Sequence, residues 1–319
     1  MAIREFMDLH YRHFNARETV AAAKGWIELL DRGGKMMVTL AGAMSTAELG
    51  ISLARMIREG KVHAISCTAA NLEEDVFNLV AHDEYCTVSN WRYLTPEAEL
   101  QLREDGFNRV TDTGIPETVL RHIEKRMVKH WSAAADAGES YFPCEYMYKL
   151  FEDKSFHDHF QVPKEHSWLY AAWEHKIPVY SPGFEDSTLG NIFTAHVISG
   201  DVKSHSAVKS GTMQMEHLVN WYLEHHEEGV GFFQIGGGIA GDFAICAVPL
   251  IIQDLQRKVN LWSYFAQISD STTSYGSYSG AEPNEKITWY KLAPDTPTYM
   301  INSDATIVAP LIFAYVLGD

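Results

Sequence analysis

The first third of the chain repeats a unit of strand, turn and helix. Residues 35–43 (KMMVTLAGA) have the pattern of a buried strand, and Ser45 can cap a helix predicted over 46–59. A second strand over 62–67 and a helix that resumes at Leu72 follow directly. Two consecutive strand–helix units require a crossover between strands that run in the same direction, and this favours a parallel sheet.

The remaining pattern extends that sheet. Further strands are predicted over 177–181, 229–235, 261–268 and 298–301, and a helix over 242–257. The stretch 95–161 is mostly helical in pattern and richer in charge, which indicates an insertion. We therefore predict that residues 1–319 form one doubly wound α/β domain with a mostly parallel sheet and a helical insertion at about 95–161.

The charge balance limits the class of partner. Basic residues number 26 and acidic residues 42, which gives a formal net charge of −16. A surface of this sign repels phosphate backbones and anionic lipid but attracts cations. We expect no nucleic-acid partner and no membrane, and a basic small molecule is the ligand class that the charge favours.

Neither a secretory signal nor a membrane span is predicted. The N-terminal stretch lacks an apolar signal core, and no apolar run approaches the ~20 residues that cross a bilayer. The 4 cysteines are scattered without CxxC spacing, so no disulfide framework is indicated. The close histidine pairs, His157 with His159 and His225 with His226, have no third ligand placed by the sequence, so no metal is expected. A soluble, cytoplasmic protein is the expectation.

A glycine-rich turn is the sharpest short motif. Gly236, Gly238 and Gly241 form a GxGxxG that leaves an apolar strand and opens a helix, as dinucleotide-binding turns do. Backbone amides there can approach a pyrophosphate, and Asp270 after the next strand could accept hydrogen bonds from a ribose. The interval from Gly241 to Asp270 exceeds the usual ~20 residues, however, and Asp242 would repel a phosphate. The motif alone fits a tight structural turn as well as a phosphate cradle.

Two further patterns carry chemistry. Acids follow several predicted strand ends, where they could form a cation-binding cleft or could cap helix N-termini. They are Glu73, Glu74, Glu185, Asp186, Asp242, Glu285 and Asp304. Lys291 has apolar and aromatic neighbours, with Trp289 on the same face if the segment is extended. Desolvation there would favour a neutral, nucleophilic amine, and a surface lysine lying along a tryptophan is the alternative.

The string EPNEKITWYK, with Glu285, Trp289 and Lys291, resembles the active-site segment of the deoxyhypusine synthase family. Other segments agree in the same order along nearly the whole chain. They are Ser45 with Thr46, TAANLEED from Thr68, LREDGFNRV from Leu102, IPVYSPGFEDSTLGN from Ile177, IGGG from Ile235, SYGSYSGAEP from Ser274 and SDATIVAPLIFA from Ser303. The resemblance implies a Rossmann-like fold and a homotetramer of two tight dimers that binds NAD near the dimer interfaces.

The resemblance also implies a reaction. NAD oxidises an amine carbon of spermidine, the resulting imine loses diaminopropane, and the butyl fragment passes to an enzyme lysine as a second imine. An acceptor amine then takes the fragment, and the stored hydride reduces it. In the true synthase the acceptor is a lysine of a translation factor.

Site residues follow by position from the resemblance. The implied catalytic residues are Lys291, Glu285 and Asp242. The implied NAD contacts are Ser45, Thr46, Thr68, Ala69, Ala70, Glu74, Asp186, Gly237, Asp270, Ser271, Asp304 and Ala305. The implied amine contacts are Glu73, Asn191, Tyr278, Glu285 and Trp289.

Several positions depart from the family pattern. Asn191 replaces an amine-binding Asp, Asp242 replaces a catalytic His, and Tyr275 and Tyr278 replace two acids. These changes remove charge pairing to an ammonium, whereas Tyr278 with Trp289 could hold a cation by its ring faces, worth ~1 to 2 kcal/mol when desolvated. A planar guanidinium suits such a site. We predict an NAD-dependent aminobutyl-type transferase that acts on a free polyamine or guanidino-amine.

Three alternatives remain open at this point. The first is a genuine deoxyhypusine synthase that modifies a translation-factor lysine. The second is a homologue that binds NAD or a polyamine without turnover, against which the retention of Glu285, Trp289 and Lys291 argues. The third is an NAD dehydrogenase for a small amine, which is favoured only if Lys291 is dispensable.

Overall fold

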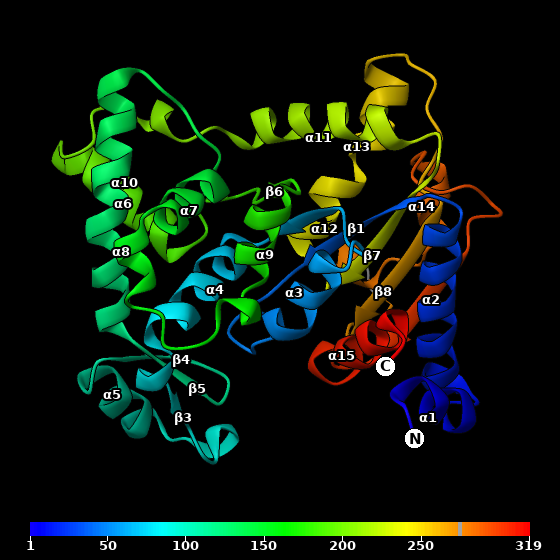
Figure 1. The fold of residues 1–319 in the computed structure, drawn as a ribbon, viewed down its shortest axis with the longest axis horizontal. Helices are drawn as coiled ribbons and strands as arrows, with labels where there is room; N and C mark the ends of the chain where they lie inside the picture. Colours follow the sequence, from blue (N-terminus) through cyan, green and yellow to red (C-terminus); the bar gives the residue numbers. More distant parts are fainter. Residues whose placement is uncertain (274–275) are drawn as a thin grey trace.

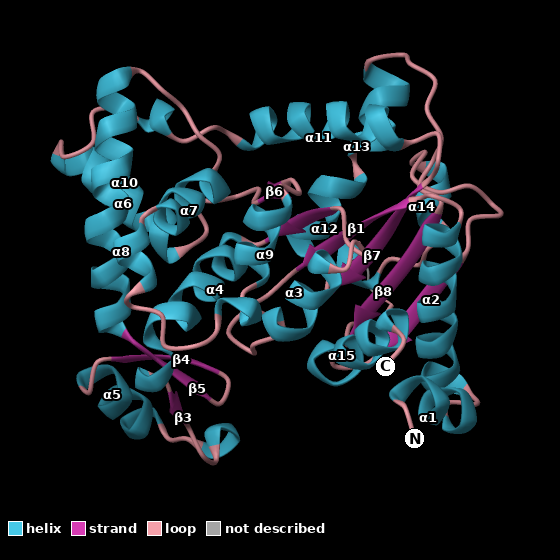
Figure 2. Cartoon of the chain, in the orientation of Figure 1, coloured by secondary structure: helices cyan, strands magenta, loops and turns pink. Residues whose placement is uncertain are grey.

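The computed structural model describes residues 1–273 and 276–319. Its centre is a six-stranded parallel sheet (Figure 2) with the order β6-β2-β1-β7-β8-β9. The strands are β1 Lys35–Leu40, β2 Ala64–Cys67, β6 Val179–Tyr180, β7 Val230–Ile235, β8 Tyr264–Ser269 and β9 Thr298–Asn302. The chain moves outward from β1 to one edge and returns to β7, which confirms the predicted doubly wound sheet. The carboxyl ends of β1 and β7 therefore form the switch point, where such folds bind ligands. Tyr275 lies outside the described residues.

Alternate residues of the central strands point into two hydrophobic cores. In β1, Val38 lies in one core and Met37 in the other, and Phe233 and Phe232 of β7 divide in the same way. Helices on both faces supply these cores (Figure 1). They include α2 (Phe14–Asp31), α3 (Gly50–Arg58) and α15 (Ala305–Leu317) on one face, and α11 (Gly211–His225), α12 (Gly238–Ile245) and α13 (Ala247–Pro249) on the other.

The crossover helices begin at other residues than predicted. The helix predicted over 46–59 begins only at Gly50, because Ser45 does not cap it. The Ser45 hydroxyl accepts from the Trp168 indole (2.9 Å), and its amide donates to Asn71 (2.8 Å). The next helix, α4 (Ala69–Ala81), begins earlier than predicted because Thr68 caps it. The helix predicted over 242–257 divides into α12, α13 and a π-helical turn at Leu250–Asp254.

The segment predicted as a helical insertion also contributes to a small sheet. Its helices are α5 Pro96–Glu104, α6 Glu117–Ala137, α7 Pro143–Glu152 and α8 Lys154–His157. The three-stranded antiparallel sheet has the order β3-β5-β4, with β3 Cys86–Thr87, β4 Phe107–Val110 and β5 Thr113–Pro116. Strands this short do not establish an alternating pattern, so the periodicity did not reveal them. The sheet lies near one end of α6 (Figure 2).

The remaining helices complete the description. They are α1 Ile3–His10, α9 Trp168–His175, α10 Thr188–Ser199 and α14 Glu285–Thr288, together with short 3₁₀ turns. Within the described part of the chain, no helix has both the length and the apolar character needed to cross a bilayer.

Candidate active site

The glycine-rich turn lies at the switch point of the sheet. β7 leads into Gly236 and Gly237, and α12 begins at Gly238. The backbones of Gly236 (φ +77°) and Gly238 (φ +56°) are left-handed, a conformation that glycine adopts without strain. A Cβ atom on Gly237 would collide with Ser279 Oγ. All three positions therefore need glycine on backbone grounds, before any ligand is considered.

A cavity of about 270 Å³ opens beside this turn. Residues that follow β1, β7, β8 and β9 line it, among them Gly42, Gly236, Asp270, Asp304 and Ala305. Asp270 is exposed, and Asp304 caps α15 by accepting a hydrogen bond from the Thr306 amide (2.8 Å). The fold thus gathers three of the predicted cofactor residues at one edge of the sheet.

Lys291 is buried on the face of the sheet that α12 covers. Only 7% of its surface is exposed, and its Nζ lies 3.2 Å from Oδ1 of Asp242. The same Nζ lies 5.5 Å from the ring centre of Tyr278. Cys246, one helical turn after Asp242, has its Sγ 3.7 Å from the same carboxylate oxygen. The structure therefore brings Lys291, Asp242 and Tyr278, all predicted site residues, into one cluster.

Two buried glutamines connect this cluster to the glycine turn. Gln234 of β7 accepts from the Tyr278 hydroxyl (2.7 Å) and donates to the Gly236 carbonyl (2.9 Å). Gln267, its partner across the β7–β8 ladder, donates to the same carbonyl (3.1 Å) and to Ser279 (2.7 Å). Sequence analysis missed both, although one polar residue at the same position in two apolar strands was a usable signal.

A second lysine, Lys286, also lies in the cluster and was not singled out from the sequence. It is 3% exposed, and its Nζ donates to the Ala281 carbonyl (3.2 Å). The Nζ lies 4.8 Å from the ring centre of Phe265 and 5.2 Å from that of Tyr278. Burial, and next the charge of Lys291, lower the pKa of Lys286 to about 8.

The segment from Glu285 to Lys291 is not extended. Glu285 opens the short helix α14, and Tyr290 has a left-handed backbone (φ +56°) directly before Lys291. The helix and turn place Glu285 and Trp289 at the surface, where Trp289 is 64% exposed. Trp289 is thus a surface residue of the single chain, and its place in the pocket of Lys291 stays a prediction.

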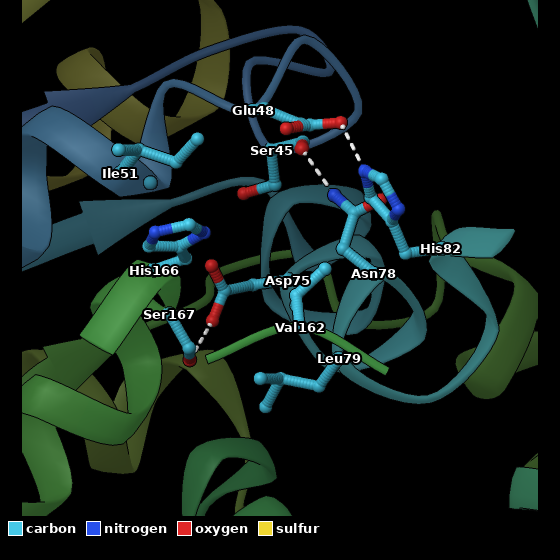
Figure 3. Close-up of a pocket in the computed structure, with 11 residues that line it drawn as sticks. Ser45, Glu48, Ile51, Asp75, Asn78, Leu79, His82, Val162, His166 and Ser167 are labelled. Atoms are coloured by element: carbon cyan, nitrogen blue, oxygen red, sulfur yellow. Dashed lines mark hydrogen bonds and ion pairs between the residues drawn. The ribbon is translucent and has the colours of Figure 1, made fainter. Parts of the chain in front are cut away.

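Two buried acids of α4 hold the first turns of other helices. Glu73 accepts from the amides of Thr188 (3.0 Å) and Leu189 (2.7 Å) at the start of α10. Asp75 accepts from the Ser167 hydroxyl, as Figure 3 shows, and also from amides at the start of α9. Burial raises the pKa of both carboxyls to about 7. For Glu73, implied as an amine contact, the structure shows helix capping.

A second group of implied NAD contacts lies on the loop after β1 and on the N-cap and first two turns of α4, which follows β2. These are Ser45, Thr46, Thr68, Ala69, Ala70 and Glu74. Ser45 is buried, and its carbonyl accepts from Asn78 (2.7 Å), as Figure 3 shows. Glu74 accepts from the Tyr85 hydroxyl (3.0 Å), and burial raises its pKa to about 7. Ser45 and Glu74 are thus occupied by contacts within the chain.

The other implied residues lie mostly at the surface. Asp186, Asn191 and Ser271 are exposed. The Asn191 amide donates to the Ser187 carbonyl (2.6 Å), so its partner lies at the start of α10 and not in the lysine cluster. Among the described residues, no group of three or more His, Cys, Asp or Glu side chains is arranged to hold a metal ion.

Comparison with known proteins places this chain among the deoxyhypusine synthases and proteins similar to them. The family model of deoxyhypusine synthase matches residues 6–316. "Probable deoxyhypusine synthase 1" of Archaeoglobus fulgidus is 25% identical over 308 residues, which cover 95% of this chain and 90% of that protein. A "Deoxyhypusine synthase-like protein" of Nostoc sp. is 27% identical over 330 residues and covers 100% of this chain and 82% of that one.

A solved structure shares the fold. It is the crystal structure of a "putative deoxyhypusine synthase from Entamoeba histolytica", with a TM-score of 0.54 and 13% identity, over 88% of this chain and 74% of that chain. The resemblance found in the sequence is confirmed by the family match. The chain belongs to the deoxyhypusine synthase family.

Proposed function

We propose that the protein is an NAD-dependent transferase that moves an aminobutyl-type group from a polyamine or guanidino-amine through an imine on Lys291. Membership of the family supports aminobutyl transfer as the reaction class. The observation that carries the proposal is an amine that is 7% exposed and 3.2 Å from the carboxylate of Asp242, close to the glycine turn. A lysine amine held in a fixed position can act as a nucleophile that forms an imine with a carbonyl-type carbon.

The transfer step needs the neutral amine of Lys291. Its nitrogen lone pair forms a bond to the electrophilic carbon of the donor imine. The π electrons of the protonated C=N bond move to the donor nitrogen, and a proton then passes to this nitrogen from the lysine nitrogen. The remaining carbon–nitrogen bond breaks as the lone pair of the lysine nitrogen forms the new C=N bond, and the departing amine leaves neutral. Asp242 orients the Lys291 nitrogen and stabilises the positive charge of the lysine imine. An acceptor amine displaces Lys291 by the same bond changes in reverse.

The switch-point cavity fits part of a nucleotide cofactor. Its glycine backbone admits a close approach, and the exposed carboxylate of Asp270, with Asp304, suits ribose hydroxyls. Bound NAD would supply a hydride acceptor for the donor carbon and return the hydride after transfer. At about 270 Å³ the cavity is smaller than the ~300–1,000 Å³ of small-molecule pockets, which supports a site completed by a second subunit.

The surroundings of Lys291 bear on the substrate. The ring of Tyr278 already faces the ammonium groups of Lys286 and Lys291, so it belongs to the lysine cluster. Trp289 and Glu285 are exposed residues of the same segment and could offer a ring face and a negative charge to an incoming cation. A guanidinium, which is planar and weakly hydrated, suits this pair well.

A homotetramer of two tight dimers is part of the proposal. Apolar side chains near the site are exposed in the single chain, namely Trp289, Tyr290 and Ile239. Covering them with a second subunit would bury apolar surface, which favours association. The same contact would shield Lys291 and its substrate from water.

Product analysis tests the proposed function. The protein is incubated with NAD and each of putrescine, spermidine and agmatine, and products are identified by mass spectrometry. We expect a new product that carries the transferred fragment, and none with Lys291→Arg, because arginine keeps the charge but forms no imine. Absence of product from the wild type would contradict the proposal. The second candidate function is modification of a protein lysine, which the names of the relatives favour. Adding a hypusine-type translation factor as acceptor tests it.

A further inference from the structure

Asn71 is a buried polar residue in the first turn of α4, and its side chain joins two segments at the switch point. Its Nδ2 lies within hydrogen-bonding distance of the Leu40 carbonyl (3.1 Å) and the Gly42 carbonyl (3.0 Å), which follow along β1. The same nitrogen donates to Thr68 Oγ1 (2.8 Å), at the N-cap of α4. Its Oδ1 accepts from the amide of Ser45 (2.8 Å). The side chain thus ties the segment after β1 to the segment after β2.

The loop between β1 and α3 depends on these contacts for its shape. Residues 42–49 form consecutive turns, and the backbone of Gly42 is left-handed (φ +61°). The Gly42 carbonyl accepts from Asn71 and also from the Thr68 hydroxyl (2.8 Å). The buried Ser45 donates its amide to Asn71. Irregular backbone takes its shape from the groups that pair with its N–H and C=O, so the first half of this loop is held by α4 and its N-cap.

The residues that Asn71 holds border the proposed cofactor site. Gly42 forms part of the wall of the switch-point cavity. Ser45 and Thr68 are two of the NAD contacts that the family resemblance implies. Because Asn71 has none of its surface exposed, it acts on a ligand through these residues.

We infer that Asn71 is a positioning residue that holds the loop after β1 in the shape that binds the cofactor. The inference rests on the proposed function, in which the switch-point cavity takes part of the nucleotide. A loop that already has its bound shape loses less conformational freedom when the ligand binds, and this favours affinity. An amide side chain suits the position because it offers donors to the carbonyls at the end of β1 and an acceptor to the Ser45 amide at the same time.

Hydrogen exchange tests the effect on the loop without any ligand. Exchange of the amides of residues 42–49 is followed by mass spectrometry in the wild type and in Asn71→Ala. We expect the Ser45 amide to exchange about tenfold faster or more in the variant, because its acceptor is gone. Gln214→Ala is the matched control, since Gln214 is also buried and its side-chain amide bonds to the backbone of Ser181 (2.7 and 3.3 Å), directly after β6. The control should leave exchange over 42–49 unchanged.

Calorimetric titration with NAD tests the consequence for the cofactor. We expect Asn71→Ala to raise the dissociation constant about tenfold or more, and Gln214→Ala to keep it within about twofold. Asn71→Asp keeps the shape of the side chain but turns a carboxylate oxygen toward the carbonyls of Leu40 and Gly42, so it should weaken binding as well.

The two measurements separate the inference from the proposed function. Unchanged exchange of the Ser45 amide in Asn71→Ala, or wild-type affinity for NAD in both Asn71 variants, would overturn the inference. A wild type that binds no NAD would contradict the proposed function instead, and the exchange of the Ser45 amide would still decide whether Asn71 holds the loop.

Discussion

Glu73 is a buried carboxyl group held by backbone amides at the start of α10, and burial raises its pKa to about 7. Because this value lies above that of the unfolded chain, the folded protein binds the proton more tightly. The contribution of Glu73 to the free energy of unfolding is therefore fully present below the unfolded pKa and is lost as the pH rises through about 7.

We predict that Glu73→Gln removes this pH dependence. Relative to the variant, the wild type should lose free energy of unfolding between about pH 5 and pH 7, by up to ~1.4 kcal/mol per pH unit. Urea unfolding of both proteins across this range measures the effect. Glu104→Gln, at an exposed position, should follow the wild type. Parallel curves for Glu73→Gln and the wild type would show that Glu73 does not titrate in this range.

The proposed function assigns the choice between NAD and NADP to Asp270. Its exposed carboxylate at the switch-point cavity would accept hydrogen bonds from ribose hydroxyls and would repel a phosphate. We predict that NAD binds more tightly than NADP, and that Asp270→Asn lowers the ratio of the NADP to the NAD dissociation constant by about tenfold. Calorimetric titration measures both constants. Equal or tighter binding of NADP by the wild type would exclude this role.

The site residues could be predicted from the sequence only in part. Lys291 and Asp242 could be named together because the family resemblance assigns both to one site, and the structure places them in contact. The burial of Lys286 could not be predicted, because it depends on α14 and on the left-handed turn at Tyr290. Sequence spacing in an extended segment would have placed Trp289, not Lys286, on the side of Lys291.

At the scale of elements, the turn between β7 and α12 lets the segment that carries Ser279 approach its backbone closely. Gly237 lies against Ser279. The two buried glutamines, Gln234 and Gln267, both donate hydrogen bonds to the carbonyl of Gly236. The loop that carries Tyr278 is thus attached to the same turn that borders the switch-point cavity. A change at this turn should affect cofactor binding and the lysine cluster together.

Gly237→Ala tests this coupling. The added methyl group must displace Ser279, and we expect a loss of about 1–3 kcal/mol in the free energy of unfolding and a weaker affinity for NAD. Gly211→Ala is the matched control, because a Cβ atom there meets nothing within 4 Å. Denaturant unfolding and calorimetry measure the two effects. An unchanged affinity for NAD in Gly237→Ala would separate the turn from the cofactor site.

Elements with long, regular patterns were the predictable ones. The strands β1, β7 and β8 match their expected positions closely, because each is a continuous apolar run covered on both faces. The hairpin of β4 and β5 was missed because each strand has only 4 residues. The late start of α3 was missed because Ser45 hydrogen-bonds to Trp168, a residue distant in sequence.

At the scale of the whole molecule, two aromatic side chains next to the buried Lys291 are exposed to solvent, as expected of a surface that a second subunit covers. Trp289 and Tyr290 are 64% and 49% exposed in the single chain. We predict that sedimentation velocity at micromolar concentration shows a tetramer, and that Trp289→Glu shifts it toward smaller species by placing a charge in the contact. Tyr93→Glu, at another exposed aromatic residue, should leave the assembly intact. A wild-type monomer would contradict the proposed shared site.

The central claim is that Lys291 forms a covalent imine with a fragment of the substrate, and trapping it is the most direct measurement. The wild type is incubated with NAD and the donor found by product analysis, borohydride is added, and the protein is digested and sequenced by mass spectrometry. The account predicts an alkyl group of the mass of the transferred fragment on Lys291, dependent on NAD, and none in Lys291→Arg, which should still bind NAD. Full transfer activity in Lys291→Arg, or a trapped fragment on another residue with Lys291 unmodified, would contradict it.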